Sequence, residues 1–302
     1  MIEKQNYPLG FWLAVGAALG FSAKAIFVKL AYQVPIPDSV AIDAITLLAL
    51  RMLLSAPAFG IAAFNMKSAA TLSPRHWVAL VGVGLAGYYG ASILDFWGLM
   101  YISAGLERLI LFTYPSLTLL LGVVFFGKPL QRRELLALLI TYIGIASAFA
   151  HDLHLSENSH SVWVGAGLVF ASSLSYAVYL VGGGELIARL GSARFTALAM
   201  AVATAAALLH YLIARPWSEA FNQPLRIYVL AGGMALFSTV IPVFMQSAAI
   251  KHIGASRASM IGILGPVATL FMGWWILGEA ISVWQIFGAA LVIVGVGLIS
   301  KK

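Results

Sequence analysis

The sequence contains no cysteine, which excludes disulfide bonds, thiolate chemistry and cysteine-bound metals. Charged residues are scarce as well: Asp, Glu, Lys and Arg make up 10% of the 302 residues, against about 25% in a typical soluble domain. Hydrophobic residues account for 61% of the chain. A surface of this composition faces lipid rather than water, so we expect an integral membrane protein embedded in a lipid bilayer.

Motifs of enzymes and of nucleotide-binding proteins are also missing. The segment 122–128 has the spacing Gly-x-x-x-x-Gly-Lys, but Pro129 stands where a phosphate loop has Ser or Thr. A lipid-embedded helix is expected before it, where a phosphate loop follows a strand. No Gly-x-Ser-x-Gly or His-Glu-x-x-His motif occurs. We therefore expect no enzyme, no cofactor and no bound metal.

Long apolar runs occupy almost the whole chain. They fall at about 9–31, 40–64, 76–99, 103–126, 131–150, 162–186, 194–214, 226–249, 254–277 and 281–300. Each run is long enough to cross a hydrocarbon core of about 30 Å as a helix, and a helix satisfies its own backbone hydrogen bonds in lipid. The runs are too uniformly apolar for barrel strands, which alternate. The sequence predicts an all-α membrane protein with ten transmembrane helices.

The basic residues set the expected orientation. With the N-terminus in the cytoplasm, the cytoplasmic segments hold Lys4, Lys67, Arg75, Lys128, Arg132, Arg133, Arg189, Arg194, Lys251, Arg257, Lys301 and Lys302. The opposite side holds only Lys29, Arg215 and Arg226. Twelve against three is a strong positive-inside bias, so we expect both termini on the cytoplasmic side of a bacterial-type inner membrane. Because topology accounts for the formal charge of +7, we expect no nucleic-acid partner.

The two halves of the chain resemble each other. The polar stretch 151–161 is read as an external linker between a first five-helix repeat, 1–150, and a second, 162–302. When Pro115 is aligned with Pro266, the residues that meet are Gly122 with Gly273, Gly127 with Gly278, and Gly144 with Gly295. An odd number of spans per repeat turns the second repeat upside down. Inverted repeats place a substrate site near the midplane between the halves and change its access by rocking.

Several local patterns resemble one transporter family. The first half contains Leu-Asp-Phe-Trp-Gly-Leu at 94–99, Phe-Thr-Tyr-Pro-Ser at 112–116 and Gly-Lys-Pro-Leu at 127–130. The second half contains Gly-Ala-Ser at 254–256, Gly-Pro-Val at 265–267 and Leu-Gly-Glu at 277–279. Together these resemble the EamA family of the drug/metabolite transporter superfamily, one copy per half. The resemblance implies a ten-helix inverted-repeat fold with a central cavity. The family includes exporters of amino acids and other metabolites, and the resemblance does not identify the cargo.

Charged side chains inside the apolar runs cost about 2.5–3.5 kcal/mol each, which makes them functional candidates. Counted from the predicted helix ends, Lys24, Arg51 and Asp95 lie deepest. Asp43, Glu107 and Arg108 lie close enough to the membrane surface to be simply hydrated. Two interpretations remain open, and the two can coexist: a self-neutralising network that holds the first four spans together, and a vestibule that handles a charged or zwitterionic substrate.

Repeat symmetry adds further candidates. Lys24 in the first span matches Tyr176 in the sixth, and Asp95 in the third span matches Gln246 in the eighth. Polar groups at matched depth favour one shared cavity, although helix–helix hydrogen bonding, worth about 0.6 kcal/mol on average, also explains them. Six aromatic residues have two possible roles. They line this cavity, where they would stack a flat ligand or hold a cation, or they only pack against neighbouring helices. They are Tyr88, Tyr89, Phe112, Tyr114, Tyr176 and Tyr179.

Matched prolines and repeated glycines predict helix packing. Pro115 and Pro266 lie inside the fourth and ninth spans, where each removes a backbone hydrogen bond and kinks its helix. Such kinks either border a transport site or are fixed parts of the fold. Glycines of the last span allow close helix contact, within the chain or with a second copy in a homodimer; they are Gly288, Gly295 and Gly297.

These observations predict a secondary transporter that exports a small polar or amphipathic metabolite, amino acid-like or related, by alternating access. An importer of a small metabolite is the alternative within transport, and a membrane scaffold or sensor is the alternative outside it. The predicted substrate-binding residues are Lys24, Arg51, Tyr88, Tyr89, Asp95, Phe112, Tyr114, Tyr176, Tyr179 and Gln246.

Overall fold

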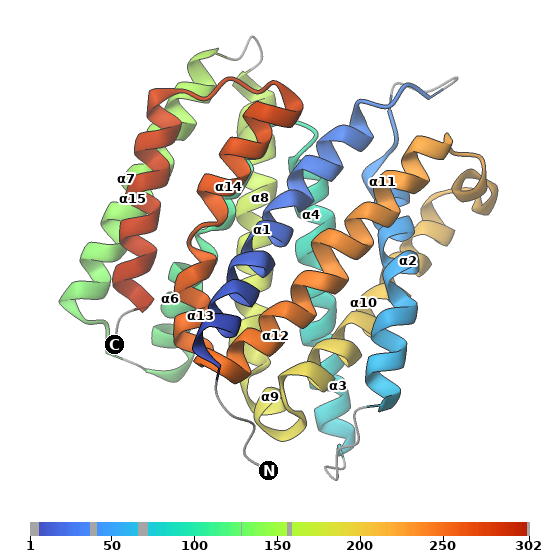
Figure 1. Ribbon diagram of the computed structural model, residues 1–302, viewed down its shortest axis with the longest axis horizontal. Helices are drawn as coiled ribbons and strands as arrows, with labels where there is room; N and C mark the ends of the chain where they lie inside the picture. The colour runs from blue at the N-terminus through green and yellow to red at the C-terminus, as the bar shows by residue number, and fades with distance from the viewer. Residues whose placement is uncertain (1–5, 37–40, 66–71, 128, 156–158, 301–302) are drawn as a thin grey trace.

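The computed structural model describes residues 6–36, 41–65, 72–127, 129–155 and 159–300, which form helices joined by short connections (Figure 1). The first half contains α1 (Tyr7–Tyr32), α2 (Ala44–Asn65), α3 (Pro74–Gly84), η1 (Leu85–Gly90), α4 (Ala91–Gly98), α5 (Ala104–Leu111), α6 (Tyr114–Phe126) and α7 (Arg132–Leu155). The second half contains α8 (Ser159–Gly182), α9 (Gly184–Leu190), α10 (Ser192–Ala214), η2 (Trp217–Phe221), α11 (Leu225–Ala235), η3 (Leu236–Val240), α12 (Ile241–Ile253), α13 (Ala255–Gly262), α14 (Gly265–Met272), η4 (Gly273–Leu277) and α15 (Val283–Ser300). The segments η1, η3 and η4 are π-helical, and η2 is a 3₁₀ turn.

Within the described residues, nine helical segments are long and apolar enough to cross a membrane. Several consist of consecutive elements in line, such as α3–η1–α4, α5–α6 and α11–η3–α12. The shorter apolar helix Val283–Leu298 within α15 provides a tenth span. The fold is therefore the predicted all-α membrane protein.

Two helix boundaries differ from the expected ones. α7 continues to Leu155, so the first part of the stretch 151–161 is helical, and 156–158 lie outside the described residues. The sixth span ends at Gly182, and the short helix α9 follows. Three consecutive glycines explain this break, because glycine disfavours a helix interior.

The two repeats run in opposite directions across the molecule. α1 begins at the lower edge in Figure 1, whereas its counterpart α8 begins at the upper edge. Gly127 ends α6 with φ of 60°, and its aligned partner Gly278 ends η4 with φ of 70°. Because a left-handed conformation favours glycine, the same helix end occurs once in each repeat.

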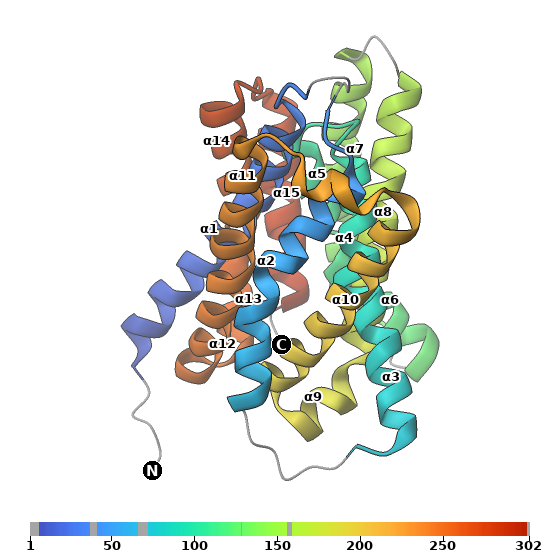
Figure 2. The same cartoon turned by 90° about the vertical axis from the view of Figure 1, so that its right-hand side faces the viewer.

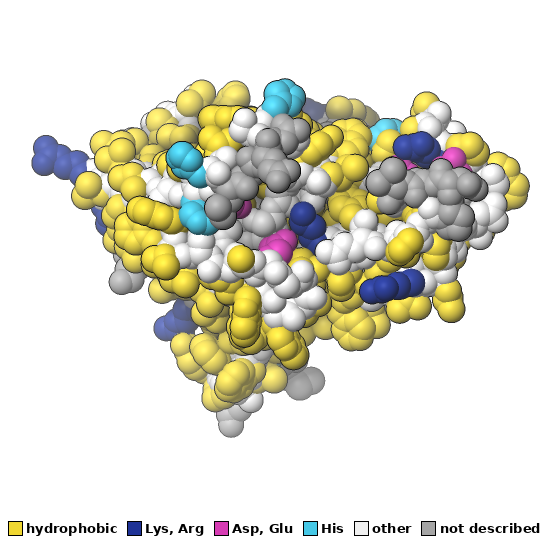
Figure 3. All heavy atoms as spheres, turned by 90° about the horizontal axis from the view of Figure 1, so that it is seen from above, with side chains coloured by type: hydrophobic (Ala, Val, Ile, Leu, Met, Phe, Trp, Pro, Cys, Tyr) yellow, Lys and Arg dark blue, Asp and Glu magenta, His cyan; other side chains and the backbone are white. Residues whose placement is uncertain are grey.

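The start of α1 and the end of α15 lie on the same side of the molecule (Figure 1). The basic residues expected on the cytoplasmic side and described by the structure lie near helix ends there; they are Arg75, Arg132, Arg133, Arg189, Arg194, Lys251 and Arg257. Lys4, Lys67, Lys128, Lys301 and Lys302 lie outside the described residues. Figure 3 shows the opposite side, where a few histidines and charged side chains are scattered among apolar and uncharged groups.

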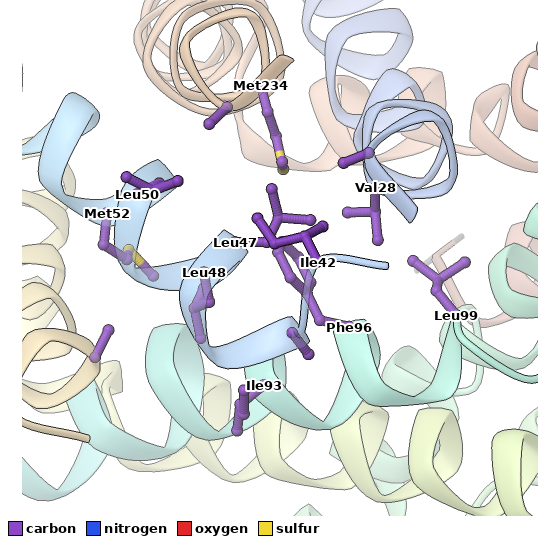
Figure 4. Close-up of a cluster of buried hydrophobic side chains, with 14 of the residues drawn as sticks. Val28, Ile42, Leu47, Leu48, Leu50, Met52, Ile93, Phe96, Leu99 and Met234 are labelled. Carbon is purple, nitrogen blue, oxygen red and sulfur yellow. The ribbon is translucent and has the colours of Figure 1, made fainter. Parts of the chain in front are cut away.

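The helices form two layers. Figures 1 and 2 show α1, α11, α12, α13 and α14 on one side of the molecule and α3, α4, α8 and α10 on the other. Side chains from several of these helices meet in Figure 4, including Val28 of α1, Leu47 of α2, Phe96 of α4 and Met234 of α11. All four are buried. Because lipid is as apolar as these side chains, close packing rather than removal from water stabilises the contact.

α7 and α15 pack against each other at one edge of the molecule (Figure 1). A Cβ atom at Gly288 would lie 2.5 Å from the carbonyl oxygen of Gly144, and one at Gly295 would lie 2.7 Å from that of Ala137. Glycine therefore lets the two backbones approach. At Gly297 the nearest atom outside the helix would be 3.9 Å away. The close contacts of Gly288 and Gly295 lie within the chain, and the homodimer stays a prediction.

Candidate functional site

A cavity of about 510 Å³ lies between the two layers and is lined by both repeats. The first repeat contributes Lys24, Arg51, Tyr88, Asp95, Arg108, Phe112 and Tyr114, among others. The second contributes Ser172, Tyr176, Tyr179, Ser238 and Gln246, among others. This volume is in the range of pockets that hold small organic molecules. Nine of the ten predicted binding residues are thus brought to one cavity.

The cavity extends toward the side of the molecule where α1 begins. Its lining includes Ser192 at the start of α10 and Ile250 near the end of α12. A second hollow of about 370 Å³ shares Ser192, Ser247 and Ile250 with it and adds the basic Arg194 and Lys251. The cavity therefore continues to the side that the sequence predicts to be cytoplasmic.

Irregular helix borders the cavity at matched positions of the two repeats. The π-helical segments η1 and η3 interrupt the third and eighth spans and begin at Leu85 and Leu236, which are aligned positions. Tyr88 of η1 and Ser238 of η3 both line the cavity. Single π-helical turns are rare and frequently mark functional sites. Their paired occurrence indicates that the cavity is a shared feature of both repeats.

The fourth and ninth spans break at matched positions as well. α5 gives way to α6 at residues 112–113, and α13 gives way to α14 at residues 263–264. Pro115 and Pro266 are the second residues of α6 and α14. Phe112, in the first break, lines the cavity. A proline ring cannot continue the hydrogen-bond ladder of the preceding turn, which accounts for the position of each break.

Lys24 contacts two carboxylates from different spans. Its Nζ lies 2.6 Å from Asp95 Oδ2 and 3.2 Å from Glu107 Oε1. The lysine side chain is 17% exposed, whereas the Asp95 and Glu107 side chains are 2% and 0% exposed. Lys24 and Asp95 also line the cavity. The charge network and the cavity, which the sequence left as alternatives, therefore share residues.

Glu107 and Arg108 are not solvated, contrary to the expectation from sequence. Glu107 is 0% exposed and Arg108 is 8% exposed. Counting depth from the helix end assumes water at that end, but Glu279 lies over the start of α5. Its two carboxylate oxygens accept hydrogen bonds from the backbone N–H of Ala104 at 3.0 and 3.1 Å. In the sequence, the pair of opposite charges Glu107 and Arg108 within an apolar run was the feature that indicated this part of the site.

Asp43 lies apart from the cavity. Its side chain is 27% exposed and accepts hydrogen bonds from the backbone N–H groups of Ile45 and Thr46. Arg215 lies 3.6 Å from the same carboxylate. Asp43 therefore caps the start of α2. Its partial exposure agrees with the expectation that this carboxylate is hydrated.

Two guanidinium groups also reach the cavity. Arg51 donates a hydrogen bond to Ser92 Oγ at 2.9 Å, and its guanidinium carbon lies 5.1 Å from the ring centre of Phe96. The guanidinium carbon of Arg108 lies 5.2 Å from the ring centre of Phe112. These are cation–π distances, so each guanidinium is held against an aromatic face; Phe112 lines the cavity, whereas Phe96 is buried behind it.

Tyrosines form one wall of the cavity. The rings of Tyr88 and Tyr179 lie 5.1 Å apart, and their hydroxyl oxygens are 3.2 Å apart. Tyr176 lies edge-on to Tyr114 at 5.2 Å and stacks on Tyr179 at 5.4 Å. The wall therefore offers aromatic faces and edges together with phenol groups.

Tyr89 is the predicted binding residue that does not line the cavity. Its hydroxyl lies 2.8 Å from His210 Nδ1 of α10, within hydrogen-bond distance. Adjacent residues on a helix face different directions, so Tyr88 and Tyr89 do not reach the same space. The sequence could not decide between the two because the π-helical segment η1 shifts the helical register here.

The fold and the cavity define the class of protein: a multi-pass membrane protein with two inverted five-helix repeats around a central cavity. The model of the EamA-like transporter family matches residues 8–150 and again residues 163–301. The chain therefore belongs to the EamA-like transporter family.

Related proteins are named as transporters of unassigned substrate. The chain is similar to the uncharacterized transporter YcbK of Bacillus subtilis, with 32% identity over 89% of this chain and 85% of that protein. It is also similar to the uncharacterized transporter YyaM of the same organism, with 26% identity over 74% of this chain and 72% of YyaM. A crystal structure with 17% identity superposes with a TM-score of 0.65 over 97% of this chain and 96% of its own. The last likeness shows the shared fold.

Proposed function

We propose that this protein is a secondary transporter that exports a small polar or amphipathic metabolite, amino acid-like or related, by alternating access. The observation that carries this proposal is the cavity between the repeats, which both repeats line with polar and aromatic side chains. A binding site at the repeat interface, next to interrupted helices, is the arrangement on which alternating access depends.

The shape of the cavity supports loading from the cytoplasm. It continues toward the side where α1 begins, and the hollow at that end carries Arg194 and Lys251. Toward the opposite side, Lys24, Asp95 and Glu107 join three spans through buried contacts. We propose that breaking and remaking contacts of this kind accompanies the change of access. An importer would release cargo through the same opening, so the direction of flux must be measured.

The alternatives make different demands on the cavity. A scaffold or sensor needs no passage, and its function would survive when the cavity is filled.

Filling the cavity should stop transport without unfolding the protein. Ser247 lines both the cavity and the hollow at its end, so Ser247→Trp should block the passage sterically. For any compound that the native protein carries, we expect flux into proteoliposomes of the variant to fall to the background measured in protein-free vesicles. The assay is a panel of labelled amino acids, organic anions, organic cations, nucleosides and sugars.

Ile213→Trp is the matched control, because Ile213 is 76% exposed on α10 and does not line the cavity. This variant should keep native flux. Loss of flux in both variants, or in neither, would contradict the assignment of the passage. Vesicles of known orientation give the direction, since an exporter moves cargo from the face that carries the termini to the opposite face.

A further inference from the structure

Two buried arginines of the cavity lack a carboxylate partner. Arg51 is 5% exposed and Arg108 is 8% exposed. Among the described residues, no carboxylate oxygen lies within the 4.0 Å ion-pair distance of either guanidinium. The Nε atoms of both side chains are buried without a hydrogen-bond partner. Buried charges are normally paired, so this arrangement needs an explanation.

The carboxylates of Asp95 and Glu107 pair with Lys24 rather than with the arginines. Each contacts Lys24 through one oxygen, and the other oxygen, Asp95 Oδ1 or Glu107 Oε2, is buried without a hydrogen-bond partner. With every group in its usual ionised form, the cluster of Lys24, Arg51, Arg108, Asp95 and Glu107 has one positive charge in excess. Arginine stays protonated in proteins, so a bound anion would neutralise this excess without any change in the charge of Lys24.

The existing contacts of the arginines orient them rather than neutralise them. Arg51 donates to Ser92 and lies over Phe96, and Arg108 lies over Phe112 with its Nη2 3.4 Å from Ser22 Oγ. Hydroxyl groups and ring faces fix the plane of a guanidinium. They leave the buried Nε of each side chain without a hydrogen-bond acceptor, which an anion bound at the guanidinium would supply.

We propose that Arg51 and Arg108 form the subsite for an anionic group of the transported molecule, a carboxylate or a phosphate. Guanidinium groups bind both anions through paired N–H donors. The aromatic wall formed by Tyr88, Tyr176 and Tyr179 takes the flat or apolar body of the same molecule. This assignment rests on the proposed transport function and narrows its substrate class to organic anions.

Ligand-induced thermal stabilisation of the purified full chain in detergent tests the subsite independently of transport. The probes are benzoate, phenyl phosphate, benzamide and benzylamine at equal concentrations, with inorganic phosphate and sodium chloride at matched ionic strength. We expect benzoate or phenyl phosphate to raise the unfolding temperature, and which of them does so identifies the anion. The neutral and cationic probes should have no such effect.

Arg51→Gln and Arg108→Gln should each lower the affinity for the stabilising anion about ten- to a hundredfold, as expected for loss of a hydrogen bond to a charged group. Arg226→Gln is the control, because Arg226 is exposed and does not line the cavity. The unfolding temperature without ligand shows that each variant folds, and Arg51→Lys retains the charge if Arg51→Gln does not fold. Stabilisation by benzamide or benzylamine alone, by none of the probes, or equally in the glutamine variants would overturn the proposal.

Flux of the stabilising probe separates the two claims. If the anion binds and the arginine variants lose it, but proteoliposomes show no flux of any compound, the subsite stands and the transport function fails. If flux occurs only for neutral or cationic compounds and is unaffected by Arg51→Gln and Arg108→Gln, the transport function stands and the anion subsite fails.

Discussion

Replacing Lys24 with alanine should destabilise the protein by about 3–5 kcal/mol, the usual cost of removing one partner from a buried ion pair. The lysine Nζ contacts Asp95 and Glu107, whose side chains are 2% and 0% exposed. Without the lysine, the two buried carboxylates lose the only cation that lies within ion-pair distance of them among the described residues. Equilibrium unfolding of the purified protein in mixed micelles measures the change in free energy.

Lys29→Ala is the matched control for this variant. Lys29 lies on the same helix, and among the described residues it has no carboxylate within the 4.0 Å ion-pair distance. Its loss should therefore cost less than the loss of Lys24. The double variant Lys24→Ala with Glu107→Gln should recover part of the lost stability, because one of the orphaned carboxylates is removed. Equal effects of the two single alanine variants would refute a specific role for the cluster.

Gly295→Ala should disrupt the contact between the last span and α7. A Cβ atom at this position would lie 2.7 Å from the carbonyl oxygen of Ala137 and 3.0 Å from the backbone N of Thr141. Both are backbone atoms of α7 and cannot move aside as a flexible side chain can. Overpacking of this kind costs about 1–3 kcal/mol, and the unfolding free energy should fall by that amount.

Gly297→Ala separates packing from the general effect of adding a methyl group. Gly297 lies on the same helix, and its added Cβ would be 3.9 Å from the nearest atom of another element. Alanine is a better helix former than glycine by up to about 1 kcal/mol, so Gly297→Ala should be neutral or slightly stabilising. Destabilisation of similar size at both positions would show that α7 and α15 do not approach as closely as described.

Much of the fold could be predicted because lipid imposes strict rules on sequence. Apolar runs of sufficient length must be helices, and charges between them set the orientation. The alignment of Pro115 with Pro266 also located the two helix breaks. The aligned Gly127 and Gly278 both end a helix in the left-handed conformation in the structure. These features depend on how proline and glycine act on the backbone at their own positions, so they can be read from one sequence.

The site was harder to predict because it depends on contacts between distant segments. Glu107 and Arg108 seemed shallow, since the covering carboxylate of Glu279 lies far away in the sequence. Tyr88 and Tyr89 are indistinguishable by composition, and a π-helical segment decides which of them reaches the cavity. The pairing of Lys24 with two carboxylates likewise requires knowledge of which helix faces meet.

The natural absence of cysteine makes one measurement especially direct. Gln246 lines the cavity on α12, so Gln246→Cys places the only thiol of the protein in the proposed passage. A membrane-impermeant maleimide added from the cytoplasmic face of oriented vesicles should label this thiol and stop transport, and a transported compound should slow the labelling. A thiol that reacts from neither face, or that reacts at the same rate with and without every compound carried, would contradict the assignment of this cavity as the transport path.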